Sequence, residues 1–211
     1  AKFLSEQDGV KIVAVIERDG VISNDSGLNI HDLRQHLAET GGLKGFADGE
    51  YSERGGEALQ MECDILVLAA MENQIHGGNA GNIRTRLVVE GANGPTTPRA
   101  DNILLERDIP VLPDILANAG GVTVSYYEWL QNQANEQWGL EQVTARLEAR
   151  MHAAVDAVFN RWQSFAVGSE VPAGAAVDGE AAQPLPDFRT VALLIAIERV
   201  ARATLIRGIW P

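Results

Sequence analysis

Residues 63–70 have the sequence Cys-Asp-Ile-Leu-Val-Leu-Ala-Ala (CDILVLAA), and this stretch decides the fold prediction. An almost uninterrupted apolar run of this length is typical of a β-strand that is covered on both faces, as in a parallel sheet. Further strand-like runs occupy Val10–Ile16, Arg86–Glu90 and Ile109–Leu112, and helical stretches such as Pro98–Arg107 lie between them. Strands that alternate with short helices predict an α/β fold with a doubly wound parallel sheet.

The composition excludes several classes of function. The 211-residue chain has 29 Asp and Glu against 17 Lys and Arg, and its net charge is -12. Such a chain repels nucleic-acid phosphates and anionic membrane surfaces, and no apolar run is long enough to span a bilayer. The single cysteine, Cys63, cannot form an internal disulfide and fits a reducing compartment, so we expect a cytoplasmic protein. The four scattered histidines form no metal-ligand pattern, and we expect no metal site.

Short polar and glycine-rich sequences follow successive predicted strands. They are Glu17–Gly20, Ala69–Asn73, Glu90–Thr97 (EGANGPTT) and Asn118–Gly121 (NAGG). Each of them is an ordinary turn former when it is taken alone. In an open parallel sheet, however, ligands bind outside the carboxyl ends of the strands, and these loops would line one such crevice. Together they predict a ligand site at this edge of the sheet.

Glu17 closes the first predicted strand, where a dinucleotide-binding fold places an acidic side chain against the adenosine ribose hydroxyls. This position favours NAD. Arg18 leaves NADP open as an alternative, because its guanidinium could neutralise a 2′-phosphate. A solvated pair of charges at a strand end is the other interpretation. The glycine-rich fingerprint G-x-G-x-x-G, which should precede this strand by one helix, is absent. We therefore expect the chain to begin inside a larger protein.

Four segments carry a family resemblance: Glu90–Thr97, Pro113–Gly121 (PDILANAGG), Val122–Trp129 (VTVSYYEW) and Asp187–Arg202 (DFRTVALLIAIERVAR). They resemble the C-terminal, coenzyme-binding half of glutamate dehydrogenase, within the Glu/Leu/Phe/Val dehydrogenase family. The resemblance covers nearly the whole chain. It implies a Rossmann-like fold that is truncated at its N-terminus and followed by C-terminal helices. It also implies NAD- or NADP-dependent oxidation of glutamate to 2-oxoglutarate and ammonia, and the reverse reaction.

The resemblance also implies which residues bind the coenzyme. Asn93 and Asn118 would help to hold the nicotinamide ribose and carboxamide. Ala69 and Ala70 would pass close to the dinucleotide, because small side chains allow a flat ring or a ribose to approach the end of a strand.

Two further residues are implied to bind the substrate. Ser125 matches the serine that forms a hydrogen bond with the side-chain carboxylate of glutamate. Val122 lies three residues earlier, on the same face of a predicted helix, and would line the same pocket. The alternative for Ser125 is a hydrogen bond to its own helix backbone, which is the more common fate of such a serine.

The family's catalytic residues belong to an N-terminal domain that this sequence does not contain. No residue of the chain is therefore assigned an acid or base role, and we expect residues 1–211 alone to be inactive. The family resemblance implies that the full-length protein is a homo-oligomer, a hexamer. The competing hypothesis is a non-catalytic, truncated Rossmann-like module that serves in binding or assembly.

The domain prediction has two parts. Residues 1–121 are expected to form the incomplete Rossmann domain, and residues 122–211 are expected to supply helices that pack on it. Residues 168–186, rich in Ala, Gly and Pro and without periodicity, predict a flexible surface insertion. Because the central first strand of the dinucleotide fold is missing, Val10–Ile16 and Asp64–Ala69 are expected to have unpaired edges or to pair with each other.

Overall fold

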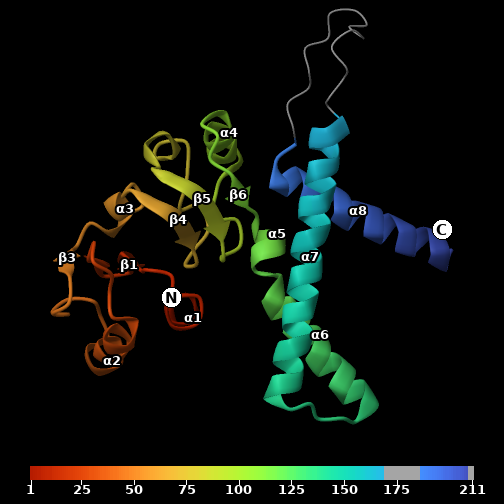
Figure 1. Ribbon diagram of the computed structural model, residues 1–211, viewed down its shortest axis with the longest axis horizontal. Coiled ribbons are helices and arrows are strands. Elements are labelled where there is room, and N and C mark those ends of the chain that lie inside the picture. Colours follow the sequence, from red (N-terminus) through yellow and green to blue (C-terminus); the bar gives the residue numbers. More distant parts are fainter. Residues whose placement is uncertain (169–185, 209–211) are drawn as a thin grey trace, which may run out of the picture. The chain divides into compact units, whose positions relative to one another are not determined.

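The computed structural model describes residues 1–168 and 186–208, which form two compact units (Figure 1). The first unit contains Ala1–Asp64 and Asn82–Thr85, and the second contains Ile65–Gly81 and the described residues from Arg86 onward. Nearly all of the predicted insertion, residues 169–185, lies outside the described residues.

A three-stranded antiparallel sheet forms the centre of the first unit, in the order β1-β2-β3. β1 (Ala14–Glu17) and β2 (Gly20–Ser23) make a tight hairpin, and β3 (Glu50–Ser52) pairs with β2. Gly20 has a φ of +147°, and a Cβ at this position would collide with the Ser52 carbonyl oxygen. The hairpin therefore requires glycine where β2 begins.

This hairpin shows that one sequence prediction is wrong. The sequence predicts a parallel strand at Val10–Ile16, whereas β1 begins at Ala14 and pairs antiparallel with β2. Only two residues join β1 to β2, and strands joined by so short a turn can pair only in the antiparallel direction. β1 and β4 (Cys63–Leu68) lie in different sheets, so the expected alternative of direct pairing between them is not observed either.

The first unit has a small apolar core to which one of its three helices, α2 (Ile30–Thr40), contributes. The other two are α1 (Lys2–Glu6) and α3 (Gly55–Ala58). α2 begins after Asn29, whose side-chain oxygen accepts hydrogen bonds from two backbone amides of the first turn. The core cluster contains five buried residues: Ile22, Leu28, Ile30, Leu33 and Leu43. The stretch around Leu43, which has strand-like composition, forms turns and contributes a buried side chain instead of a strand.

The second sheet has the order β4-β5-β6 and confirms the predicted parallel arrangement. β5 (Thr85–Glu90) and β6 (Val111–Leu112) are parallel, and α4 (Pro98–Glu106) connects them. Thr97 caps the start of α4, because its hydroxyl accepts a hydrogen bond from the Ala100 backbone amide, and Pro98 occupies the first helical position. β4 forms an edge of this sheet, and its Ile65 and Val67 side chains are 46% and 44% exposed.

The rest of the second unit is helical. The 3₁₀ turn η1 (Ala80–Asn82) follows β4, and α5 (Asp114–Ala117), α6 (Ala119–Ala134), α7 (Leu140–Gly168) and α8 (Phe188–Arg207) follow β6. α7 packs against both α6 and α8 (Figure 1). A core cluster of Leu116, Val158, Val191 and Ala192 joins α5, α7 and α8. Within the described ranges, no helix is long and apolar enough to cross a membrane.

Candidate coenzyme site

An amide pair lies beyond the carboxyl ends of β5 and β6. Asn93 belongs to the loop that follows β5, and Asn118 ends α5. The Asn118 Nδ2 group donates a hydrogen bond of 2.7 Å to Asn93 Oδ1. Among the described residues, neither Asn93 Nδ2 nor Asn118 Oδ1 has another side-chain partner. The structure thus brings two predicted site residues together, with one amide donor and one amide acceptor left over.

The loops that follow β4 and β5 approach each other closely. Ala69 and Ala70 come directly after β4 and are exposed. A Cβ placed on Gly91 would lie 3.3 Å from the Ala69 Cβ, and the Ala92 amide donates to the Leu68 carbonyl at 2.8 Å. Small residues on both sides therefore leave the two strand ends in near contact.

A buried ionic network links the end of β5 to α4, α5 and α8. Glu90, the last residue of β5, has a side chain that is 0% exposed. The Arg189 guanidinium donates to Glu90 Oε1 at 2.9 Å and to Asp101 Oδ2 at 2.8 Å, and its Nη1 lies 3.6 Å from Asp114 Oδ1. We therefore define the Arg189 network as Arg189, Glu90, Asp101 and Asp114. A buried carboxylate needs such a cation because desolvating an unpaired charge is costly.

The Arg189 guanidinium stays charged. Burial by itself lowers the pKa of Arg189, but the hydrogen bonds that Arg189 donates to Glu90 and Asp101, together with the negative charges of these carboxylates, raise it above its ordinary value. The network therefore keeps its cation. This network is not among the features predicted from the sequence. A signal was present, because Glu90 ends an apolar strand and Arg189 lies in one of the segments with a family resemblance.

The predicted substrate residues lie on α6. The Ser125 hydroxyl donates to the Gly121 carbonyl at 3.2 Å, which is the backbone bond considered as its alternative. Val122 is 71% exposed. No hydrogen bond between described residues joins Ser125 to the amide pair. The role of both residues in binding glutamate stays a prediction.

Glu17 and Arg18 belong to the first unit, whereas the amide pair belongs to the second. Glu17 ends β1 opposite Gly20, and Arg18 is the first residue of the hairpin turn. Both side chains are exposed, and neither has an ion-pair partner among the described residues. They are thus accessible to a ligand, and their part in coenzyme binding stays a prediction.

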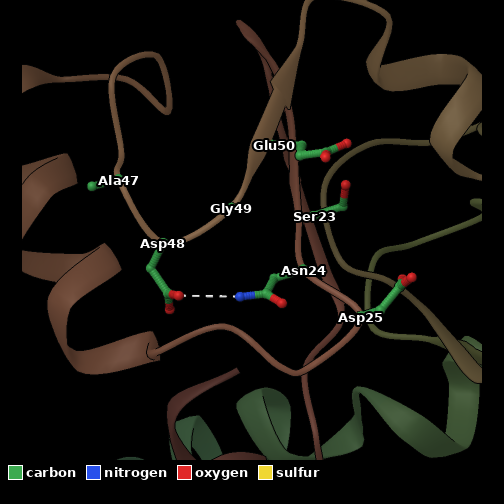
Figure 2. Close-up of a pocket in the computed structure, with 7 residues that line it drawn as sticks. All are labelled: Ser23, Asn24, Asp25, Ala47, Asp48, Gly49 and Glu50. Carbon is green, nitrogen blue, oxygen red and sulfur yellow. Dashed lines mark hydrogen bonds between the residues drawn. The ribbon is translucent and has the colours of Figure 1, made fainter.

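A separate cavity of about 440 Å³ lies at the other end of the hairpin (Figure 2). Its lining residues are Ser23, Asn24, Asp25, Ala47, Asp48, Gly49 and Glu50. Figure 2 shows the Asn24 side chain directed at Asp48, to which its Nδ2 donates at 3.1 Å. Ser23 pairs with Ala14, whereas Glu17 pairs with Gly20, so the cavity and the turn lie at opposite ends of the hairpin. The cavity contains none of the predicted coenzyme residues.

The chain is similar to known proteins of one family. Residues 1–208 match the model of the Glutamate/Leucine/Phenylalanine/Valine dehydrogenase family. The chain belongs to this family. A protein from Thermotoga maritima that is named glutamate dehydrogenase is 43% identical over 211 residues, which cover 100% of this chain and 46% of that protein. The predicted resemblance is therefore confirmed.

Two similar family members from Halobacterium salinarum differ in their named coenzyme. NADP-specific glutamate dehydrogenase A1 is 40% identical over 100% of this chain and 46% of its own length. NAD-specific glutamate dehydrogenase A is 39% identical over 100% of this chain and 44% of its own length. The chain thus spans slightly less than half the length of these relatives, and it is about equally similar to both coenzyme types.

Solved structures confirm the predicted fold class. The hetero-hexameric glutamate dehydrogenase from Thermus thermophilus aligns with a TM-score of 0.79 and 32% identity, over 98% of this chain and 44% of that chain. Glutamate dehydrogenase from Peptoniphilus asaccharolyticus aligns with a TM-score of 0.73 and 31% identity, over 97% of this chain and 43% of that chain.

Proposed function

We propose that this chain is the coenzyme-binding half of a glutamate dehydrogenase, which oxidises glutamate to 2-oxoglutarate and ammonia with NAD or NADP and catalyses the reverse reaction. The observation that carries the proposal is the amide pair of Asn93 and Asn118 beyond the strand ends. The family membership supports it, as does the match of the whole chain to slightly less than half of proteins named glutamate dehydrogenases. The proposal assigns no acid or base to this chain.

The amide pair suits the nicotinamide carboxamide. When bound, the nicotinamide ring accepts the hydride from the substrate carbon. The carboxamide has one acceptor oxygen and one donor NH₂, which complement the remaining donor of Asn93 and acceptor of Asn118. Ala69 and Ala70 would leave room for the dinucleotide beside this pair. These residues would hold and orient the ring, which is the main contribution of a protein to hydride transfer.

For the coenzyme, we propose that NAD is favoured over NADP. Glu17 is exposed at the end of β1 and offers two acceptor oxygens to ribose hydroxyls. Its negative charge would repel a 2′-phosphate, although the neighbouring Arg18 would attract one. The relatives from Halobacterium salinarum include one of each specificity, so the proposed preference for NAD is inferred from Glu17 and Arg18 alone.

For the substrate, we propose that Ser125 and Val122 line the glutamate pocket. A serine hydroxyl has a single proton to donate, and in the structure it goes to the Gly121 carbonyl. Binding of the glutamate side chain would redirect this proton to the substrate carboxylate. The new bond is stronger because its acceptor is charged.

For the assembly, we propose a homo-oligomer, a hexamer, in the cytoplasm. Large apolar side chains are exposed on two helices of the second unit: Tyr126 and Trp129 of α6, and Ile197, Val200, Leu205 and Ile206 of α8. Exposed apolar surface of this extent is typical of interfaces. The similar protein from Thermus thermophilus is named as a hetero-hexamer. The single cysteine supports the cytoplasmic location.

The test uses the protein expressed from its complete reading frame. Reduction of NAD and of NADP is followed with glutamate, leucine and phenylalanine as alternative substrates. We expect kcat/KM to be at least about tenfold higher for glutamate than for either apolar amino acid, because a site built for a carboxylate discriminates against side chains that lack one. Equal use of all three, or no reduction of either coenzyme, would contradict the proposed function. The second outcome would favour the non-catalytic module.

A further inference from the structure

Arg189 joins three elements that lie far from it in the sequence. It is in the first turn of α8, and its fork contacts Glu90 at the end of β5, Asp101 in α4 and Asp114 at the start of α5. Its own side chain is 24% exposed. A planar fork with five donors can serve several carboxylates at once, which the single ammonium of a lysine cannot do with the same geometry.

Two hydrogen bonds continue from the Arg189 network toward the amide pair. Glu90 Oε2 accepts from the Asp114 amide at 2.9 Å, and Asp114 Oδ2 accepts from the Gly94 amide at 2.8 Å. Gly94 directly follows Asn93. These two bonds therefore fix the loop after β5 relative to the start of α5.

The same bonds determine where Asn118 lies. The backbone N–H of Asn118 donates to the backbone carbonyl of Asp114 at 3.0 Å, so the single turn of α5 connects Asp114 to Asn118. The 2.7 Å bond between the two side-chain amides forms only when the loop of Asn93 and the turn of Asn118 are in this register. Asp114 thus sets the position of both partners.

Attachment of α8 does not depend on Arg189 alone. Val191 and Ala192 of α8 already pack with Leu116 of α5 and Val158 of α7 in a buried cluster. Buried ion pairs contribute little net stability compared with apolar packing, and their best-supported use is to select one arrangement. The main effect of the Arg189 network is therefore to fix the positions of Asn93 and Asn118, to which its hydrogen bonds lead.

We propose that Arg189 is a positioning residue for the nicotinamide end of the coenzyme site, and that it holds Asn93 and Asn118 in register through Glu90 and Asp114. This inference rests on the proposed function, because it assumes that the amide pair binds the nicotinamide. Arg189 itself does not touch the coenzyme. Its loss should weaken contacts with the nicotinamide and leave contacts with the rest of the dinucleotide unchanged.

The experiment compares NAD with ADP-ribose, which lacks the nicotinamide ring. Dissociation constants are measured by calorimetry for the complete protein, for Arg189→Lys and for Arg161→Lys. Arg161 is the matched control, because it forms an exposed ion pair of 3.0 Å with Glu198. We expect Arg189→Lys to weaken NAD binding about tenfold or more and to change ADP-ribose binding less than twofold. Arg161→Lys should change neither.

A second variant covers the case in which Arg189→Lys does not fold. Asp114→Asn keeps the size of the side chain but removes the negative charge that faces Gly94 and Arg189. It should weaken NAD binding several-fold, spare ADP-ribose binding and speed hydrogen exchange at the Gly94 amide. Equal weakening of both ligands by these variants, or no weakening, would overturn the positioning role. If the unaltered protein binds NAD no more tightly than ADP-ribose, the proposed function of the amide pair fails instead.

Discussion

Both units have a buried apolar cluster, but among the residues that the structure describes only those of the second unit also form a buried ionic network. The first is a hairpin sheet built on local pairing and an apolar cluster, in which Ile22 and Leu43 are 0% exposed. In the second, the fully buried Glu90 binds Arg189 across 99 positions of sequence. Apolar packing is non-directional, whereas charged hydrogen bonds fix angles and register. The amide pair of the second unit is therefore held by directional bonds, whereas Glu17 lies exposed at the end of a strand of the first unit.

The largest expected effect tests whether the units lose stability separately. Leu43→Ala in the first unit and Leu104→Ala in the second are a matched pair, because both side chains are 0% exposed. Each should cost about 2–5 kcal/mol of local stability, through lost burial and a residual cavity. Hydrogen exchange followed by mass spectrometry should show faster exchange mainly in the unit that carries the substitution. Uniform acceleration through both units would show instead that they unfold as one.

A smaller effect is expected on substrate selection. Ser125→Ala should cost about 1.5–3 kcal/mol in kcat/KM for glutamate, the usual range for a hydrogen bond to a charged group. Thermal stability should hardly change, because the hydroxyl now bonds only to the Gly121 carbonyl. Kinetics with glutamate and with a small apolar amino acid provide the check. Equal losses of kcat/KM for the two amino acids would show that Ser125 does not bind the side-chain carboxylate of glutamate.

The first unit should contribute to coenzyme choice. Glu17→Ser keeps a ribose hydrogen-bonding group and removes the charge that repels a 2′-phosphate. The ratio of kcat/KM for NAD to that for NADP should fall about tenfold, which corresponds to roughly 1.4 kcal/mol. Glu50→Ser is the matched control, since Glu50 is another exposed acid of the same sheet. An unchanged ratio in Glu17→Ser, or an equal shift in the control, would show that Glu17 does not determine the coenzyme preference.

The sequence predicts the second unit better than the first for a physical reason. Continuous apolar runs and a proline-started helix are strong local signals, and β4, β5 and α4 form where these signals lie. In the first unit, the strand-like run was compatible with either parallel or antiparallel pairing. The two-residue turn at Arg18 and Asp19 makes the pairing antiparallel. The periodicity of apolar residues indicates a strand but does not indicate which strand it pairs with or in which direction.

The candidate site was partly predictable. Asn93 and Asn118 were identified from a family resemblance, and the structure joins them by a hydrogen bond. Arg189 was missed because its partners lie 88 and 99 positions away, and no local pattern connects residues at that distance. Such networks depend on the packing of α8, which only the three-dimensional arrangement shows.

The central claim is that the Asn93 and Asn118 amide pair binds the nicotinamide end of the coenzyme. The most direct measurement is a calorimetric titration of Asn118→Ala with NAD and with ADP-ribose, in the complete protein. Asn132→Ala on α6 is the control. We predict a loss of NAD affinity of about tenfold or more, equivalent to one or two hydrogen bonds, and ADP-ribose affinity within twofold of the unaltered protein. Equal losses for the two ligands, or an unchanged affinity for NAD, would contradict the claim.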